Sequence, residues 1–327
     1  MDNNNNNNNN ENNENEDNIQ FIKNNTNNEN ISDSPLKLIQ NNKKIKHIVI
    51  SGGGSFGFTT YGILKESNKC GYWNINDIKT MYGTSAGAIF ITIISLNFQW
   101  DILDKFLLER PWQNVFKIDM YSIVNSIQSC GILNIKPIED IFSPLFLAKD
   151  LTINITMKEL YEVTGIELHM FTTKIDTFEL IDISYKTHPD WKVTESIYAS
   201  CSLPILFSPH CKDDVHYCDG GIFSNYPLYY CYMNVEDKDE IFGIKNKPNQ
   251  IKIEEKESLF EYIIKLLVKM IIKLSSKNEV IEIKNEMIVD TPIVSIYDIY
   301  LSTSNFEERE KLVNKGVNDW KVYIQKK

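Results

Sequence analysis

The sequence predicts an α/β fold, a three-layer α/β/α sandwich with a largely parallel central sheet. Short β-branched runs alternate with helical stretches along the chain, which is the pattern of repeated strand-helix units. Glycine-rich turns follow the first run, residues 45–51, and the second run, residues 78–82. A chain of 327 residues, 42% hydrophobic and 24% charged, is long and apolar enough to bury a sizeable core.

Local patterns place the elements in order. The strand-like runs, rich in Val, Ile, Phe and Thr, are 45–51, 78–82, 166–172, 178–184, 240–244 and 292–296. The stretches with helical periodicity are 57–68, 86–96, 100–110, 121–127, 136–147, 191–202 and 307–324.

The chain divides into three parts by composition. Asn occupies 17 of the first 30 positions, and residues 1–42 lack the apolar side chains needed to offset the entropy of ordering. We expect this tail to be disordered, and a prion-like assembly role is the alternative. Residues 45–232 hold the glycine-rich motifs and form the expected catalytic region. Residues 233–327 are expected to complete the same domain.

The net charge of −10 disfavours nucleic acid as a partner, because no excess of basic side chains is available to displace counterions. The first residues are neither apolar nor basic, so no signal peptide is predicted. With no long apolar segment, the sequence predicts no transmembrane helix and a cytoplasmic protein that is able to contact membranes peripherally.

The six cysteines form no C-x-x-C pair, and reduced thiols are expected. His210, Cys211, His216 and Cys218 lie close enough in sequence to hold zinc, but their spacing fits no zinc motif. No EF-hand spacing is present either. We therefore predict no metal, no calcium requirement and no cofactor.

Residues 259–274 are apolar except for four charged residues at four-residue spacing, Glu261, Lys265, Lys269 and Lys273. On a helix these charges form one stripe. The stretch is too short and too charged to span a bilayer. It is either a core helix with one solvated face or a basic amphipathic helix in a membrane interface.

The second glycine-rich turn, residues 83–87, reads G-x-S-x-G between a strand and a helix. This is the context of a nucleophile elbow, in which Gly83 and Gly87 let the chain turn sharply around Ser85. Ser85 would stand at the start of the following helix, where free N–H groups favour a developing negative charge.

The first glycine run offers two interpretations. Gly52, Gly54 and Gly57 have the spacing of a dinucleotide-binding loop, but the acidic residue expected about twenty positions later is missing. An oxyanion hole is the better use of Gly52, Gly53 and Gly54, because their N–H groups can approach a substrate without an intervening Cβ.

A serine nucleophile needs a base, and none of the five histidines lies in a motif. The more attractive base is Asp219, which Gly220 and Gly221 follow in a tight turn. A Ser-His-Asp triad using His216 is the alternative, although that histidine precedes the aspartate, whereas in α/β-hydrolases it follows.

The ordered motifs, together with residues 199–209 and 217–227, resemble the patatin-like phospholipase family over roughly residues 45–227. The resemblance implies a Ser85–Asp219 dyad, oxyanion donors at Gly52, Gly53 and Gly54, and supporting glycines. The supporting positions are Gly57, Gly83, Gly87, Gly220 and Gly221. It further implies a lipid acyl hydrolase of the phospholipase A or lysophospholipase type, whose substrate is a phospholipid or another acyl lipid, phospholipids being favoured. A catalytically weak lipid-binding or storage protein on the same fold is the alternative.

The sequence departs from the family at one position, because Phe56 stands where the family usually has a basic residue. This departure bears on how a phosphate head group would be bound.

Overall fold

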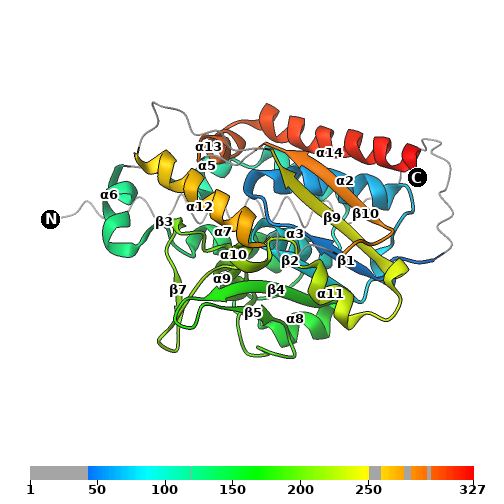
Figure 1. Ribbon diagram of the computed structural model, residues 1–327, viewed down its shortest axis with the longest axis horizontal. Coiled ribbons are helices and arrows are strands. Elements are labelled where there is room, and N and C mark those ends of the chain that lie inside the picture. Colours follow the sequence, from blue (N-terminus) through cyan, green and yellow to red (C-terminus); the bar gives the residue numbers. More distant parts are fainter. Residues whose placement is uncertain (1–42, 119, 250–258, 276–280, 293–295) are drawn as a thin grey trace.

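The computed structural model describes residues 43–118, 120–249, 259–275, 281–292 and 296–327. An eight-stranded sheet forms its centre, with helices on both faces (Figure 1). The strands of this sheet are β1 (His47–Ile50), β2 (Thr80–Thr84), β4 (Glu167–Lys174), β5 (Glu179–Ile183), β7 (His210–Lys212), β8 (Val215–Asp219), β9 (Ile241–Pro248) and β10 (Glu286–Thr291). A separate short pair consists of β3 (Gly131–Leu133) and β6 (Ile205–Phe207).

The sheet is largely parallel, as predicted. Its order is β10-β9-β1-β2-β4-β8-β7, and the five strands from β10 to β4 are parallel neighbours. The remaining strands β5, β8 and β7 are antiparallel. Because β9 and β10 pair beside β1, the part of the chain after residue 232 contributes to the same sheet as the glycine motifs.

Alternate residues of the buried strands pack into two separate hydrophobic cores. On β1, Ile48 and Ile50 face a large cluster that includes side chains of α2 (Gly57–Lys69), α3 (Ala86–Ser95) and α14 (Phe306–Lys326). Val49 faces a smaller cluster with α11 (Leu228–Asn234). This period-two alternation between two apolar cores is what places helices on both sides of the sheet.

The predicted helices are present with bounds shifted by a few residues. They correspond to α2, α3, α4 (Trp100–Asp104), α6 (Met120–Ser129), α7 (Lys136–Leu147), α9 (Val193–Cys201), α12 (Leu259–Ser275) and α14. The helix predicted at 100–110 continues after α4 as a π-helical turn, Lys105–Glu109. Helices α2 and α14 lie side by side along one face of the sheet (Figure 1).

The strand predicted at 292–296 falls mainly on residues 293–295, which lie outside the described residues. The strand found in this part of the chain is β10, which ends at Thr291, and Ile296 begins a helix, α13 (Ile296–Ser304). In β10, Met287 and Val289 are buried while Ile288 and Asp290 are exposed. An edge strand with one solvated face lacks a continuous apolar run, which is why the sequence pattern missed it.

Other short elements were also not predicted. They are α5 (Trp112–Val115), α8 (Met157–Thr164), β3, β6, β7, β8, α10 (Gly221–Ser224), α11 and α13. The start of α8 did carry a readable signal, because Thr156 and Glu159 form a capping box. The predicted disordered tail, residues 1–42, lies outside the described residues.

Helix α12 packs beside α10 (Figure 1). On its polar side Lys265 and Lys269 are half-buried and Lys273 is exposed. Among the side chains of α12 that the structure describes, the most exposed apolar ones are spaced four residues apart: Tyr262, Leu266, Met270 and Leu274. This row, which we call the exposed apolar row of α12, differs from the simple solvated polar face of a core helix. No helix within the described ranges combines the length and apolar character needed to cross a bilayer.

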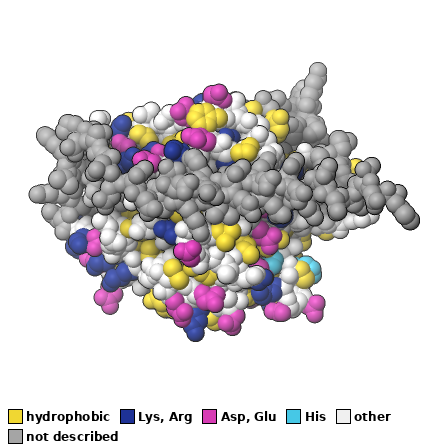
Figure 2. All heavy atoms as spheres, turned by 180° about the vertical axis from the view of Figure 1, so that it is seen from behind, with side chains coloured by type: hydrophobic (Ala, Val, Ile, Leu, Met, Phe, Trp, Pro, Cys, Tyr) yellow, Lys and Arg dark blue, Asp and Glu magenta, His cyan; other side chains and the backbone are white. Residues whose placement is uncertain are grey.

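The surface away from α12 mixes charges of both signs. Figure 2 shows the face opposite to that of Figure 1, where Lys and Arg side chains are interspersed with Asp and Glu among the described residues in view.

All six cysteines are free thiols, and their side chains lie in the described part of the chain.

Candidate active site

The G-x-S-x-G turn adopts a strained conformation at Ser85. Ser85 joins β2 to α3 with φ 54° and ψ −124°, a region that residues with a side chain rarely occupy. The glycines on either side are required by space: a Cβ on Gly83 would lie 2.6 Å from the Gly87 backbone, and one on Gly87 would lie 2.7 Å from the Ile50 carbonyl oxygen. The turn therefore holds Ser85 at the carboxyl edge of the sheet.

Two hydrogen bonds fix this turn against its surroundings. The Ser85 N–H donates to the Oγ of Ser200 at 3.0 Å, and the Thr84 hydroxyl donates to the Ser224 carbonyl at 2.8 Å. Ser200 is fully buried on α9. The strained backbone of Ser85 is thus held by elements distant in sequence, so the side chain is fixed before any ligand arrives.

Asp219 lies at the end of β8 and is 4% exposed. Its Oδ1 accepts a hydrogen bond from the Gly221 N–H at 2.7 Å. Burial raises the pKa of the Asp219 carboxyl to about 6, although hydrogen bonds from the Ser85 side chain and the Gly221 N–H lower it. A carboxylate with this pKa is a better proton acceptor than a solvated aspartate and is still ionised at neutral pH.

The glycine loop lies against the same serine. A Cβ on Gly52 would lie 3.2 Å from the Cβ of Ser85. The Gly52 N–H is not available to a ligand, because it donates to the Asn225 carbonyl at 2.9 Å. This corrects the prediction of three oxyanion donors.

The remaining donor positions are Gly53 and Gly54. Within the described part of the chain their N–H groups have no hydrogen-bond acceptor. Gly54 adopts a positive φ of 52°, which favours glycine. The N–H groups of Gly53 and Gly54 are therefore free to donate hydrogen bonds to an oxyanion.

An apolar cavity of about 260 Å³ adjoins these groups. Ser85, Asp219 and the glycine loop form its polar end. Most of the remaining wall is aliphatic or aromatic and includes Trp112, Ile138, Leu203, Phe207, Val268, Ile271 and Ile272. Because the last three belong to α12, this helix forms part of the wall. A cavity of this composition suits a hydrocarbon chain with one reactive polar end.

The histidines lie elsewhere. All five are in the described part of the chain, and none lines the cavity. His216 is exposed and lies three residues before Asp219 on β8, so its side chain points to the opposite face of the sheet. The geometry therefore does not assemble a Ser85–His216–Asp219 triad.

The other predicted positions have structural roles near the site. Gly57 lies against the Phe90 ring, Gly220 against the Phe171 backbone, and Gly221 against the Asp219 carboxylate. Phe56 is 5% exposed and lines the cavity. Among the residues the structure describes, no group of three or more His, Cys, Asp and Glu side chains could hold a metal ion.

Sequence reasoning missed four residues around Ser85 and the glycine loop. Asn225 and Asn246 each donate a side-chain N–H to the Gly52 carbonyl, at 3.3 and 3.1 Å. Ser200 and Cys201 approach from α9, and burial followed by the Asp219 charge raises the pKa of the Cys201 thiol well above its usual value. Asn225 lies within the motif segment after Asp219, but no local signal marked Asn246, which is 194 residues from Gly52.

An α/β sheet with a serine elbow, a buried carboxylate and an apolar cavity at its carboxyl edge is typical of ester hydrolases. The chain belongs to the patatin-like phospholipase family, whose model matches residues 48–232. This agrees with the resemblance predicted from the motifs.

Three comparisons illustrate the relationship. The chain is 25% identical over 218 residues to "Probable lipid hydrolase 463L" of Invertebrate iridescent virus 6, covering 64% of this chain and 73% of that protein. It is 27% identical over 181 residues to "Triacylglycerol lipase ptl3" of Schizosaccharomyces pombe, covering 53% of this chain but only 35% of that protein. The crystal structure of VipD from Legionella pneumophila matches 87% of this chain and 67% of VipD, with a TM-score of 0.55 and 16% identity, and shows the same fold.

Proposed function

We propose that this protein is a lipid acyl hydrolase that cleaves carboxylic esters through Ser85 as nucleophile and Asp219 as base. The observation that carries the proposal is the meeting of a strained serine and a buried carboxylate of raised pKa at one end of an apolar cavity. Family membership and relatives named lipid hydrolase and triacylglycerol lipase support the same class. The reaction is of the type catalysed by phospholipase A and lysophospholipases.

The first half-reaction acylates the serine. Asp219 accepts the Ser85 hydroxyl proton while Oγ attacks the ester carbonyl, and the N–H groups of Gly53 and Gly54 stabilise the resulting oxyanion. As the carbon–oxygen bond of the ester breaks, the departing alkoxide takes the proton back from Asp219 and leaves as an alcohol. The fatty acyl group stays on Ser85 with its chain in the cavity.

The second half-reaction releases the fatty acid. Asp219 accepts a proton from a water molecule that attacks the acyl carbonyl, and the same N–H groups stabilise the second oxyanion. Collapse of this intermediate breaks the Ser85 ester bond, and the Asp219 proton returns to the serine oxygen. The two half-reactions together consume only the ester and one water molecule.

Peripheral contact with a membrane is the second part of the proposal, and α12 is the element that supports it. Val268, Ile271 and Ile272 line the cavity, while the exposed apolar row of α12 faces away from it. Lys269 belongs to the predicted lysine stripe on the same helix, where a basic side chain gains about 1 kcal/mol near an anionic lipid surface. A helix with this distribution suits an interface.

The proposed chemistry is tested by trapping and substitution. Wild-type protein should be labelled once by an alkyl fluorophosphonate at Ser85, and Ser85→Ala should not be labelled and should lose essentially all hydrolysis of a chromogenic acyl ester. His216→Ala is the control and should keep most of its activity. A Ser85→Ala variant that retains a large share of turnover would contradict the mechanism and favour a lipid-binding or storage role on the same fold.

A further inference from the structure

One short segment of the chain contacts both residues of the proposed dyad. Residues 200–202 lie at the end of α9, the helix that packs against β4 and β8. The Oγ of Ser200 accepts the Ser85 N–H at 3.0 Å, and the carbonyl of Ser202 accepts the Asp219 N–H at 3.0 Å. Ser85 follows β2 and Asp219 ends β8, and these two strands are separated by β4 in the sheet. The segment therefore links two positions that strand pairing does not join directly.

A link of this kind matters because the site has no third group that orients the other two. In a Ser-His-Asp triad the aspartate orients the imidazole, which in turn bonds to the serine hydroxyl. All five histidines are in the described part of the chain and none lines the cavity, so the backbones of Ser85 and Asp219 have to be fixed in another way. A misplacement of about 1 Å between reacting groups can cost about 10²-fold in rate.

Ser85 needs the firmer restraint of the two residues. Its φ of 54° and ψ of −124° lie in a region that costs a residue with a side chain about 1–3 kcal/mol. Rotation of the peptide plane between Thr84 and Ser85 would relieve this strain and would turn the Ser85 N–H away from Ser200. The bond to Ser200 opposes the rotation, because an N–H left without an acceptor in a largely buried site costs about 1–3 kcal/mol.

Ser200 differs from the two other buried serines at this end of α9. Ser196 and Ser202 each donate to the carbonyl four residues earlier in the chain, at 3.0 and 2.7 Å. Ser200 is 0% exposed, yet it makes no such bond within the described part of the chain, and its oxygen accepts the Ser85 N–H instead. The usual partner of a buried helical serine is thus replaced by the backbone of the nucleophile.

We propose that Ser200 is a positioning residue of the active site, which fixes Ser85 through its backbone N–H while the Ser202 carbonyl of the same segment fixes Asp219. The inference rests on the proposed hydrolysis by Ser85 and Asp219, and it adds to that reaction a residue outside the motifs. Ser200 does not line the cavity, so it acts through Ser85 and not on the substrate.

The first test separates kcat from KM for a chromogenic acyl ester. Ser200→Ala should lower kcat by about tenfold to hundredfold, because Ser85 is no longer held, and should change KM by less than about twofold, because the cavity wall is untouched. Ser196→Ala is the matched control: it removes an equally buried hydroxyl one turn earlier on α9 and should leave both constants unchanged. If Ser196→Ala lowers kcat as much as Ser200→Ala does, the loss reflects packing of α9, and the proposal is wrong.

The pH profile tests position directly. The hydrogen bond from the Ser85 side chain lowers the pKa of Asp219, so a displaced Ser85 should let that pKa rise. The midpoint of kcat/KM should therefore move upward by about half a pH unit in Ser200→Ala and should not move in Ser196→Ala. Ser200→Thr, which keeps the hydroxyl oxygen, should retain the wild-type midpoint. A lower kcat with an unmoved midpoint in Ser200→Ala would contradict a positioning role.

Hydrogen exchange gives a readout that does not depend on hydrolysis. In protein with ¹⁵N-labelled serine, the Ser85 amide signal is the one that disappears in Ser85→Ala. This amide should exchange with solvent about tenfold faster in Ser200→Ala than in the wild type or in Ser196→Ala, the effect of losing one hydrogen bond. Equal exchange would overturn the inference whatever the activity, whereas absence of ester hydrolysis by the wild type would contradict the proposed function by itself.

A second variant covers the case in which Ser200→Ala does not fold. Ser200→Cys fills the same space with a sulfur atom that is a weak hydrogen-bond acceptor. It should show the lower kcat, the raised midpoint and the faster exchange of the Ser85 amide. Wild-type values in all three measurements would overturn the proposal.

Discussion

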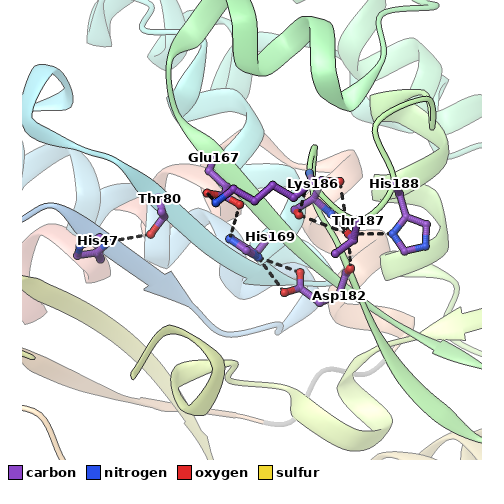
Figure 3. A network of polar contacts seen from close by, with 9 residues as sticks. His47, Thr80, Glu167, His169, Asp182, Lys186, Thr187 and His188 are labelled. Carbon is purple, nitrogen blue, oxygen red and sulfur yellow. Dashed lines mark hydrogen bonds and ion pairs between the residues drawn. The ribbon is translucent and has the colours of Figure 1, made fainter. Parts of the chain in front are cut away.

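Two buried ionisable side chains on neighbouring strands of the sheet have different surroundings, one largely apolar and the other charged. Asp219, at the end of β8, faces Ser85 and an apolar cavity without a cation in the described wall. His169, near the start of β4, lies between two carboxylates: its Nδ1 is 2.9 Å from Asp182 and its Nε2 is 3.3 Å from Glu167 (Figure 3). Thr172, the strand partner of Asp219, follows His169 by only three residues.

The pKa values express the difference. Burial is the largest influence on His169 and lowers its pKa, but hydrogen bonds and charges from Asp182 and Glu167 outweigh it and raise the pKa to about 9. At Asp219 burial prevails and raises the pKa to about 6. Pairing therefore makes the charged form of His169 stable, whereas isolation makes the charged form of Asp219 costly and ready to take up a proton.

Glu167 links the paired cluster to the surface. Lys186 donates to Glu167 at 2.7 Å, and the Tyr82 ring stacks on His169 with centroids 4.2 Å apart. Tyr82 lies three residues before Ser85 on β2, so the cluster packs against the strand that carries the nucleophile. We infer from the comparison that Asp219 serves the reaction, whereas the His169 cluster stabilises the fold.

The largest expected effect comes from Asp219→Asn. Loss of a general base should lower kcat by about 10²- to 10⁴-fold. The same change should stabilise the protein, because the folded-state pKa lies above the ordinary value and ionisation of Asp219 at pH 7 opposes folding. The difference between 3.8 and about 6 corresponds to about 3 kcal/mol.

Activity and urea unfolding at pH 7 measure both effects on one variant. Asp190→Asn, which removes an exposed carboxylate, is the control and should change neither. An Asp219→Asn variant that is inactive and also less stable would show that the buried carboxylate supports the fold, which is the role we assign to His169 instead.

The second prediction concerns the paired cluster. The folded-state pKa of His169 is raised, so its stabilisation is full below about pH 6.5 and is lost as the pH rises toward 9, by about 3 kcal/mol. His169→Gln should lower the free energy of unfolding at pH 6 and flatten its pH dependence between 6.5 and 9. His216→Gln, at an exposed histidine, should leave that dependence unchanged, and an unaltered slope in His169→Gln would contradict the pairing argument.

The third prediction is the pH profile of the reaction. With an Asp219 pKa of about 6, kcat/KM should be level above pH 7 and about tenfold lower at pH 5, since only ionised Asp219 can accept the serine proton. His169 stays protonated across this range and should not affect the profile, so His169→Gln should keep the same midpoint. A midpoint that moves in this variant would mean that the two sites are coupled.

The contrast between these sites also explains what the sequence could predict. Ser85 and Asp219 lie in short motifs whose glycines permit the sharp local turns, so both residues could be predicted from the sequence. The parallel sheet could be predicted because strand and helix patterns alternate along the chain. The contact of Asn246 with Gly52 depends on β9 pairing with β1 across the sheet, and no local pattern carries that information. The same holds for the Gly52 N–H, whose acceptor is supplied by Asn225.

The smallest expected effect concerns the solvent-exposed side of α12, the helix that forms part of the cavity wall. This surface is apolar and exposed, unlike the buried Asp219 and His169 compared above. Met270 is 50% exposed in the exposed apolar row of α12, and Met233 on α11 is 63% exposed away from the cavity. If α12 enters a membrane interface, Met270→Ser should weaken binding to anionic vesicles by about 1 kcal/mol, or about fivefold, because it removes apolar area from that contact. Hydrolysis of a monomeric ester should not change, since Met270 does not line the cavity. Met233→Ser is the matched control, and equal vesicle binding by the two variants would mean that the membrane contact lies on another surface.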